Sequence, residues 1–270
     1  MLDITFGEAT DPGKVRTNNE DSCRSFVPRS RQIARSHGWM FAVADGVGGL
    51  DRGEVASALA VATIAEGFEK AQESTSLVAL MPRLVQHANA EIHNAALSAD
   101  RRGSKMASTV VCVGIRHDQA VVAHVGDSRC YLVRDEEARL VTRDHTWVNE
   151  QRKLGLISAA EAEESEQRHV LTRSLGPELF VQADTTTLRV EPGDTLVLCC
   201  DGLHNAVTEQ DIANIAGGGN GTQAEMQSIA ERLVSYAVQV DGSDNTTAQV
   251  IRIREVERVA MYRGRVYTLR

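Results

Sequence analysis

Phe41-Ala-Val-Ala-Asp-Gly-Val-Gly-Gly49 joins a short apolar run to an aspartate and then to a series of glycines. An apolar run of this length is typical of a buried β-strand, so the carboxylate of Asp45 is expected at the end of a strand. Glycine has no side chain, and Gly46, Gly48 and Gly49 therefore leave the backbone beside that carboxylate open. The stretch predicts a buried strand that ends in an acid accessible to a ligand.

The same construction recurs three times along the chain. Asp127 follows VVAHVG, Asp201 follows LVLCC, and Asp244 precedes NTTAQVI. Acids at the ends of separate strands can converge on one place, and converging carboxylates repel one another unless hard cations lie among them. Taken alone, Asp45-Gly46 and Asp201-Gly202 are more often hairpin turns than metal ligands, because Asp-Gly is a strong hairpin dipeptide. Asp127 before Ser128 is likewise typical of a loop acid, and Asp244-Asn245 of an Asx turn. The prediction of a metal site therefore depends on their joint occurrence.

Composition favours one large globular domain. The chain has 270 residues, of which 42% are hydrophobic, and a net charge of −8 that argues against nucleic acid or an anionic membrane as a partner. No apolar run is long enough to span a bilayer, and residues 1–10 lack the pattern of a signal peptide. The five cysteines are odd in number and without CxxC spacing, which favours reduced thiols. We expect a cytoplasmic protein.

Periodicity predicts two pairs of helices separated by strands. The first pair covers 54–70 and a segment after Ser76, and the second covers 208–216 and a segment that begins at the capping box of Thr222 and Glu225. Between the pairs, STVVCVGI, AVVAHV, CYLVR and ARLVT are rich in β-branched residues and predict an antiparallel meander. Without βαβ alternation the class is α+β, with helices covering antiparallel sheets.

Other segments complete this outline. Residues 3–45 are expected to form strands around an exposed loop at 28–38, and strands are expected again in FVQADTTTLRV, DTLVLCC and TTAQVIRI. Arg263-Gly264 is the expected tip of a hairpin in the tail 255–270, added to a sheet edge. A polar insert at 147–169, called the flap below, contains a capping box at Ser158 and Glu161 that predicts a short helix. We expect one domain over 1–270.

Seven blocks in this order resemble the metal-dependent serine/threonine protein phosphatases of the 2C type, most closely the compact bacterial members. The resemblance covers about Asp11 to Arg252. It implies a central antiparallel β-sandwich flanked by antiparallel helix pairs on both faces, in four αββα layers, with a binuclear metal site at one edge. The blocks are VRTNNEDS, FAVADGVGG, STVV, VAHVGDSR, LTRSLG, LVLCCDGL and SDNTT.

The resemblance also assigns metal ligands. Asp45 matches the carboxylate that bridges two metal ions, and the carbonyl of Gly46 matches a main-chain ligand, which the absence of a side chain allows to approach the ion. Asp201 and Asp244 match the other direct carboxylate ligands. Asp127 matches an acid that helps to hold a third, looser ion. Oxygen ligands favour Mn²⁺ or Mg²⁺ over zinc. The resemblance therefore implies two or three Mn²⁺ or Mg²⁺ ions as the cofactors.

Further positions match residues that act around the metals. Glu20 and Asp21 match acids that act through metal-bound waters, and Arg16 matches an arginine whose planar fork binds the substrate phosphate. The flap matches a mobile segment beside the site, so Trp147 and Arg152 are expected to influence substrate docking and Arg173 to anchor its base. Those family members that carry a histidine after the Asp-Gly pair, or after the later glycines, differ from this chain, which has Val47 and Leu50 there.

The activity implied is hydrolysis of phosphoserine and phosphothreonine in proteins by in-line attack of a hydroxide that bridges two metal ions. Arg16 and Asp45 are the expected catalytic residues, and phosphorylated proteins and a cognate Ser/Thr kinase are the expected partners of a monomer. One alternative is a catalytically silent adaptor that binds phosphoproteins, although the complete set of acids argues against it. Another is a phosphatase that acts on an anti-sigma antagonist, which is the same chemistry in a different circuit.

Overall fold

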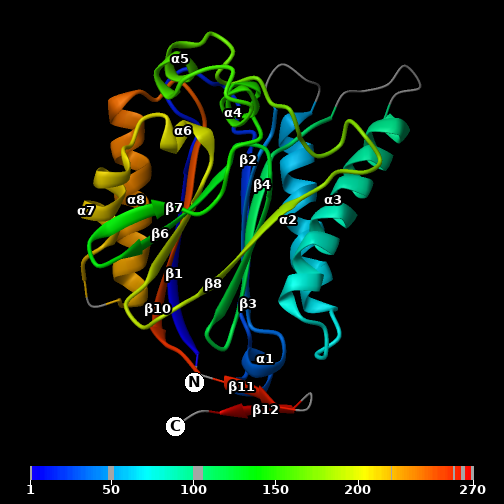
Figure 1. The fold of residues 1–270 in the computed structure, drawn as a ribbon, viewed down its shortest axis with the longest axis vertical. Coiled ribbons are helices and arrows are strands. Elements are labelled where there is room, and N and C mark those ends of the chain that lie inside the picture. The colour runs from blue at the N-terminus through cyan, green and yellow to red at the C-terminus, as the bar shows by residue number, and fades with distance from the viewer. Residues whose placement is uncertain are drawn as a thin grey trace.

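Two antiparallel five-stranded sheets pack face to face in the computed structural model, which describes residues 2–47, 52–99, 106–219, 221–257, 259–262 and 265–268. The first sheet has the order β1-β10-β9-β6-β7 and the second β2-β3-β4-β5-β8 (Figure 1). The strands of the first are Asp3–Asp11, Thr246–Glu255, Thr195–Cys199, Arg129–Arg134 and Glu137–Leu140, and those of the second are Asp21–Phe26, Trp39–Asp45, Val110–Arg116, Gln119–Val125 and Asp184–Arg189.

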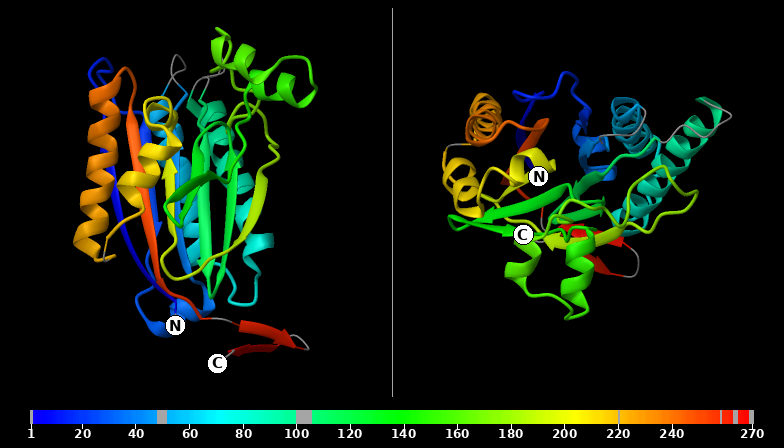
Figure 2. Two further views of the ribbon diagram at one scale, coloured as in Figure 1. Left: turned by 60° about the vertical axis from the view of Figure 1, so that its left-hand side comes forward. Right: turned by 90° about the horizontal axis from the view of Figure 1, so that it is seen from above.

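Helices cover the outer face of each sheet, so that the molecule has four layers (Figures 1 and 2). Helices α2 (Gly53–Glu69) and α3 (Leu77–Ala99) lie on the second sheet, and α7 (Glu209–Ala216) and α8 (Gln223–Val240) lie on the first. The α+β class and the predicted αββα layers are confirmed. Thr222 and Glu225 form the expected capping box of α8, and Ser158 and Glu161 form that of α5 (Ala159–Glu164).

Strand β3 shows why its sequence is apolar without interruption. Phe41 and Val43 are buried in the core between the two sheets, whereas Ala42 and Ala44 are buried in the core beneath α2 and α3. A strand in the middle of a four-layer protein is covered on both faces, so neither set of alternating side chains needs to be polar. The same burial brings Asp45, at the strand's end, to the edge of the sandwich.

The predicted meander is wrong at its centre. Strands β4 and β5 pair in the second sheet and β6 and β7 pair in the first, so the chain crosses between sheets at 126–128. Gly126 makes this crossing with a φ of 101°, in the left-handed region where a side chain is strained, and an added Cβ would lie 2.7 Å from the side chain of Thr109. Periodicity predicted the individual strands correctly, but which strands pair depends on contacts outside each strand.

Several boundaries also differ from expectation. Arg31–Ser36, placed in a loop, forms helix α1, whose N-cap Ser30 accepts a hydrogen bond from the amide of Ile33. The flap contains a second helix, α4 (Trp147–Lys153), beside the predicted one. The strand expected from Phe180 begins only at Asp184. Asp201–His204 forms a single helical turn, α6, which the apolar run before it did not predict.

The tail forms the expected hairpin but not the expected sheet contact. Strands β11 (Val259–Tyr262) and β12 (Arg265–Thr268) pair with each other as a separate two-stranded sheet, at the end of the molecule opposite α4 and α5 (Figure 1). The proposed tip, Arg263-Gly264, lies outside the described residues. Within the described part of the chain, no helix is both long and apolar enough to cross a membrane.

Candidate active site

The strand-end acids meet at the end of the sandwich that carries α4 and α6 (Figure 1). A cavity of about 330 Å³ opens there, and its lining comes from segments far apart in the sequence. The predicted residues that line it are Arg16, Glu20, Asp45, Gly46, Asp127, Asp201 and Asp244, and they are joined by Val47, Thr109, His169 and Leu171. Seven of the residues selected from the sequence therefore share one cavity.

Hydrogen bonds hold Asp45 at the base of this cavity. Its amide donates to the hydroxyl of Thr109 at 3.2 Å, and its carbonyl accepts from the amide of Thr109 at 2.8 Å and from the hydroxyl of Ser108 at 2.9 Å. Ser108 and Thr109 directly precede β4, the neighbour of β3. Because these hydrogen bonds fix the backbone of Asp45, its carboxylate is the part of the residue that extends into the cavity.

Packing requires a glycine at position 46, whereas the resemblance explained Gly46 by the approach of its carbonyl to a metal ion. A Cβ on Gly46 would lie 2.4 Å from the carbonyl carbon and oxygen of Gly53, where α2 begins. The amide of Gly46 donates to the carbonyl of Glu20 at 3.1 Å. A residue without a side chain therefore lets α2 and the Glu20 segment close on the end of β3.

Three carboxylates crowd the cavity, of which Asp127 is buried and Asp45 and Asp201 are partly buried. Burial, followed by the neighbouring acids Asp21 and Asp201, raises the pKa of Asp45 well above its ordinary value, and burial followed by Asp244 raises the pKa of Asp201. Burial, with Asp201 next, raises the pKa of Asp127 to about 7. Ionised together, these groups need positive charge nearby.

Asp21 lies beneath this group and does not line the cavity. It is the first residue of β2 and stands directly opposite Asp45 in the ladder. Only 9% of it is exposed, and neither carboxylate oxygen makes a hydrogen bond of good geometry. Burial raises the pKa of Asp21 to about 7, although the side chains of Thr247 and Cys200 partly offset this rise. A buried carboxylate without partners is a place where an ordered water or a cation fits.

The donor set fits hard divalent cations. The acids supply only oxygens, and Arg16 is the one lysine or arginine among the described residues that line the cavity. Within the described part of the chain, no three acids, histidines or cysteines already enclose a point tightly enough to hold an ion. Asp244 pairs instead with Arg16. Oxygen donors in a water-accessible cavity suit Mg²⁺ and Mn²⁺.

Arg16 enters from the loop between β1 and β2. Its guanidinium donates to Asp244 Oδ2 at 2.8 Å, and this hydrogen bond and ion pair raise the pKa of Arg16. Both side chains remain partly exposed at the cavity, 44% for Arg16 and 36% for Asp244. An oxyanion that binds Arg16 would share it with Asp244 or take its place.

Asn245 is a positioning residue that the sequence did not single out beyond an Asx turn. Its side-chain NH₂ donates to the carbonyls of Pro12 at 3.0 Å and Asn18 at 2.9 Å, and its Oδ1 accepts from the amide of Glu20 at 2.8 Å. It is buried. One amide therefore holds the segment that carries Arg16 and Glu20 against the segment that carries Asp244.

The flap residues selected from the sequence lie outside the cavity. Trp147 is 37% exposed at the start of α4, and Arg152 is exposed near the end of that helix. Arg173 forms an ion pair with Asp184 on β8 at 2.8 Å. The flap reaches the cavity at its other end instead, through His169 and Leu171. The polarity of the insert did not distinguish these two ends.

His124, His145 and His204 occupy packed positions outside the cavity. His124 is buried on β5 and stacks on His145 with the ring centroids 4.8 Å apart, which confirms that it is packed. His204 donates through Nε2 to the carbonyl of Asp127 at 3.0 Å, and burial lowers the pKa of its imidazole to about 3. Val47 places an apolar side chain in the cavity. Gly48, Gly49 and Leu50 lie outside the described residues.

Comparisons with known proteins agree with the fold. Residues 14–236 match the family model described as Protein phosphatase 2C. The chain is 33% identical to Protein phosphatase PhpP of Streptococcus pneumoniae, over 91% of this chain and 96% of that protein. It is also 33% identical to Serine/threonine phosphatase stp of Listeria innocua, over 95% of this chain and 96% of that protein.

Solved structures show the same relationship. The S. agalactiae serine/threonine phosphatase superposes with a TM-score of 0.81 at 29% identity, over 93% of this chain and all of that one. The catalytic domain of the serine/threonine phosphatase PstP in complex with 2 manganese ions superposes with a TM-score of 0.77 at 30% identity, over 94% of this chain and all of that one. The chain belongs to the protein phosphatase 2C family.

Proposed function

We propose that this metal-dependent serine/threonine phosphatase works through the cavity at the sandwich edge, with Asp45, Asp201 and Asp244 holding two Mn²⁺ or Mg²⁺ ions. The observation that carries this assignment is the meeting of these three acids, from β3, α6 and the start of β10, around one cavity. When bound, such ions supply a water of lowered pKa as the nucleophile and offset charge on the phosphoryl oxygens. Asp127 is placed to contribute to a third, looser site.

The chain's own residues position the metal ligands, bind the phosphate and close the cavity. Asp45 is rigidly held, so its carboxylate can serve two ions, and the Gly46 carbonyl is adjacent to it. Glu20 lines the cavity and acts through water, whereas Asp21 acts from below, through ordered water or by charge. Arg16 orients the phosphate by offering its guanidinium to two oxygens. The flap end, through His169 and Leu171, closes one side of the cavity.

Hydrolysis of p-nitrophenyl phosphate and of a phosphothreonine peptide tests the function. We expect turnover with Mn²⁺ or Mg²⁺, its loss with EDTA, and its return when the metal is restored. Turnover that persists in EDTA after dialysis would contradict the metal-dependent assignment. Absence of turnover with every divalent metal would instead support a binding role.

Replacing Arg16 with lysine is expected to raise KM for phosphopeptides by about tenfold, because a lysine keeps the charge but cannot bind two oxygens in one plane. Steady-state kinetics would separate KM from kcat, and Arg24→Lys on the exposed part of β2 is the matched control. An unchanged KM in Arg16→Lys would remove the phosphate-binding role.

Replacing Asn245 with alanine is expected to weaken Mn²⁺ binding by about 10- to 100-fold, as the loss of a supporting hydrogen bond commonly does. The buried groups it satisfies would also lose their partners, so the free energy of unfolding should fall by about 1–3 kcal/mol. Calorimetric titration with Mn²⁺ and thermal melts measure the two effects. Asn214→Ala on exposed α7 should change neither.

We also propose that the protein acts as a monomer in the cytoplasm, against a Ser/Thr kinase that phosphorylates the same substrates. All the acids of the cavity come from one chain, and the five cysteines are free, four of them buried. Light scattering after gel filtration would test the monomer, with a stable dimer as the contrary result. Co-expression with a candidate kinase and comparison of phosphoprotein levels would test the circuit.

A further inference from the structure

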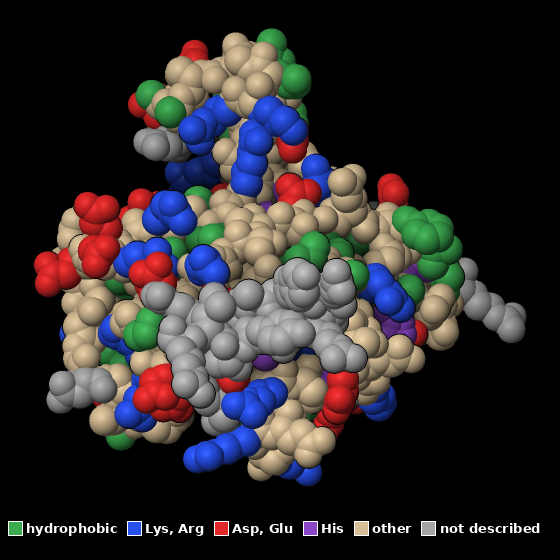
Figure 3. Space-filling model, turned by 60° about the horizontal axis from the view of Figure 1, so that its bottom comes forward, with side chains coloured by type: hydrophobic (Ala, Val, Ile, Leu, Met, Phe, Trp, Pro, Cys, Tyr) green, Lys and Arg blue, Asp and Glu red, His purple; other side chains and the backbone are tan. Residues whose placement is uncertain are grey.

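A second cavity, of about 390 Å³, lies beside the flap and shares no residue with the catalytic cavity. It is formed by β6, the segment after β7, and helix α4. Figure 3 shows Lys and Arg side chains gathered where the projection formed by α4 and α5 meets the body of the molecule. The charged residues that line the cavity, here called the basic groove, are Arg129, Arg143, Asp144, Arg152 and Lys153.

The base of the basic groove is rigid and neutral. Arg129 donates to both oxygens of Asp144, at 2.9 and 2.6 Å, and to the hydroxyl of Tyr131 at 3.0 Å. Asn149 on α4 donates to the carbonyl of Asp144 at 3.4 Å, which ties the helix to the segment after β7. A bidentate pair of this kind fixes the geometry of both partners.

The rim of the basic groove, by contrast, carries uncompensated charge. Arg143, Arg152 and Lys153 are exposed, and within the described part of the chain no carboxylate lies at ion-pair distance from any of them. The guanidinium of Arg152 donates to the amide oxygen of Asn149 at 3.3 Å. Three free positive charges around one groove contrast with the net charge of −8 of the whole chain.

The groove is connected to the catalytic cavity by the chain itself. Asp127 of the catalytic cavity is two residues before Arg129 of the groove. The flap contributes α4 to the groove at one end, and His169 and Leu171 to the catalytic cavity at the other. We therefore expect that a polypeptide whose phosphorylated residue enters the catalytic cavity can reach the groove along the flap.

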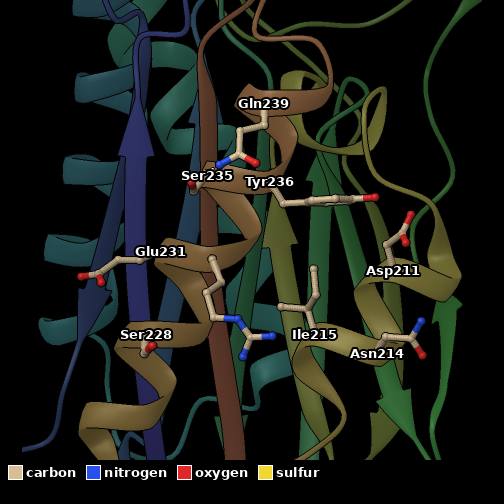
Figure 4. Close-up of a pocket in the computed structure, with 9 residues that line it drawn as sticks. Asp211, Asn214, Ile215, Ser228, Glu231, Ser235, Tyr236 and Gln239 are labelled. Atoms are coloured by element: carbon tan, nitrogen blue, oxygen red, sulfur yellow. Dashed lines mark hydrogen bonds between the residues drawn. The ribbon is translucent and has the colours of Figure 1, made fainter.

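A larger groove between α7 and α8 does not indicate a particular ligand. Its volume is about 610 Å³, and Figure 4 shows Tyr236 of α8 reaching toward Asp211 of α7 across it. Its charges are mixed, since Asp211 and Glu231 line it together with Arg232. Nothing in its lining selects one occupant, whereas the exposed charges on the rim of the basic groove are all positive.

We propose that the basic groove binds an acidic segment of the phosphoprotein substrate, away from the phosphorylated residue. The inference rests on the proposed function. The three rim cations are exposed and on long side chains, so they suit Asp and Glu side chains spread along an extended segment better than one small anion. Exposed charges of this kind act mainly by steering and orienting the partner. The groove therefore selects among phosphoproteins by sequence outside the phosphosite.

Matched phosphothreonine peptides test the proposal on the full chain with Mn²⁺. Each peptide carries four glutamates before or after the phosphothreonine, at several spacings, and its partner carries glutamines in their place. We expect one arrangement to give about a fivefold higher kcat/KM than its glutamine partner at low salt, and this preference to fade when salt shortens electrostatic range. Equal kcat/KM for every pair would overturn the proposal.

Two double variants locate the effect. Arg143→Gln with Lys153→Gln should abolish most of the preference for the glutamate peptide, because two of the three rim charges are lost. Arg24→Gln with Arg83→Gln removes the same charge from exposed positions on β2 and α3 and should retain it. If both pairs lose the preference equally, net charge and not the groove is responsible.

The same assays separate this proposal from the function on which it depends. Hydrolysis of p-nitrophenyl phosphate and of the glutamine peptides by the unaltered chain tests the phosphatase function alone. If those reactions proceed and no peptide pair differs, only the groove proposal fails. If the unaltered chain hydrolyses neither, the proposed function itself fails.

Discussion

Asp201→Asn is expected to lower kcat/KM for phosphopeptides by on the order of a thousandfold, because it removes a charged oxygen from the centre of the cavity. Asp201 lines the cavity together with Asp45 and Asp244, and the charge of Asp244 helps to raise the pKa of Asp201. An amide offers one neutral oxygen where a carboxylate offers two charged ones, so Mn²⁺ binding should weaken together with turnover. Calorimetric titration and steady-state kinetics measure both.

The thermal stability of the same variant gives an independent check. Burial and Asp244 oppose ionisation of Asp201, so a neutral side chain of the same shape should not lower the melting temperature measured in EDTA. Asp135→Asn, in the exposed turn between β6 and β7, is the matched control and should retain full activity. Full activity in Asp201→Asn would contradict the assigned metal site, and a collapse of stability in EDTA would show a structural role instead.

Gly46→Ala is expected to reduce turnover by about a hundredfold although every carboxylate is kept. The added methyl would lie 2.4 Å from the backbone of Gly53, so β3 and α2 must separate and Asp45 must move. A displacement of about 1 Å in a catalytic group can cost that much in rate. Overpacking should also lower the free energy of unfolding by about 1–3 kcal/mol.

Gly218→Ala provides the control for this substitution. A Cβ at Gly218, after α7, would have no neighbour within 4 Å, so neither activity nor stability should change appreciably. Kinetics, chemical denaturation and Mn²⁺ titration on both variants separate a local displacement from general loss of fold. An active, fully stable Gly46→Ala would show that β3 and α2 tolerate separation and that the close contact is not required.

Local signals account for what the sequence predicted well. The capping boxes at Ser158 and Thr222 depend on residues three apart, and both were found where expected. The apolar run before Asp45 reflects burial on both faces of β3, which is also a property of one segment. The ordered motif blocks identified the family, and the family implied the four layers of the fold.

Other features could not be predicted from the sequence, because they depend on residues that are distant along the chain. Nothing within the residues around Gly126 shows that β5 and β6 belong to different sheets, since that choice depends on β8 and β9. The flap's composition did not show that His169 faces the acids while Arg152 faces the basic groove. Asn245 resembles a turn residue until Pro12, Asn18 and Glu20 come within its reach.

The sequence alone thus determined which residue types stand at strand ends, where the principal helices lie, and to which family the chain belongs. Periodicity and caps are set by neighbours along the chain, and they can be recognised without a partner. Only the tertiary structure decided which acids share a cavity and which lies beneath it, because Asp21 meets Asp45 through strand pairing and β1 meets β10 across more than 200 residues. Such pairings are selected by packing of the whole core, which no single segment contains.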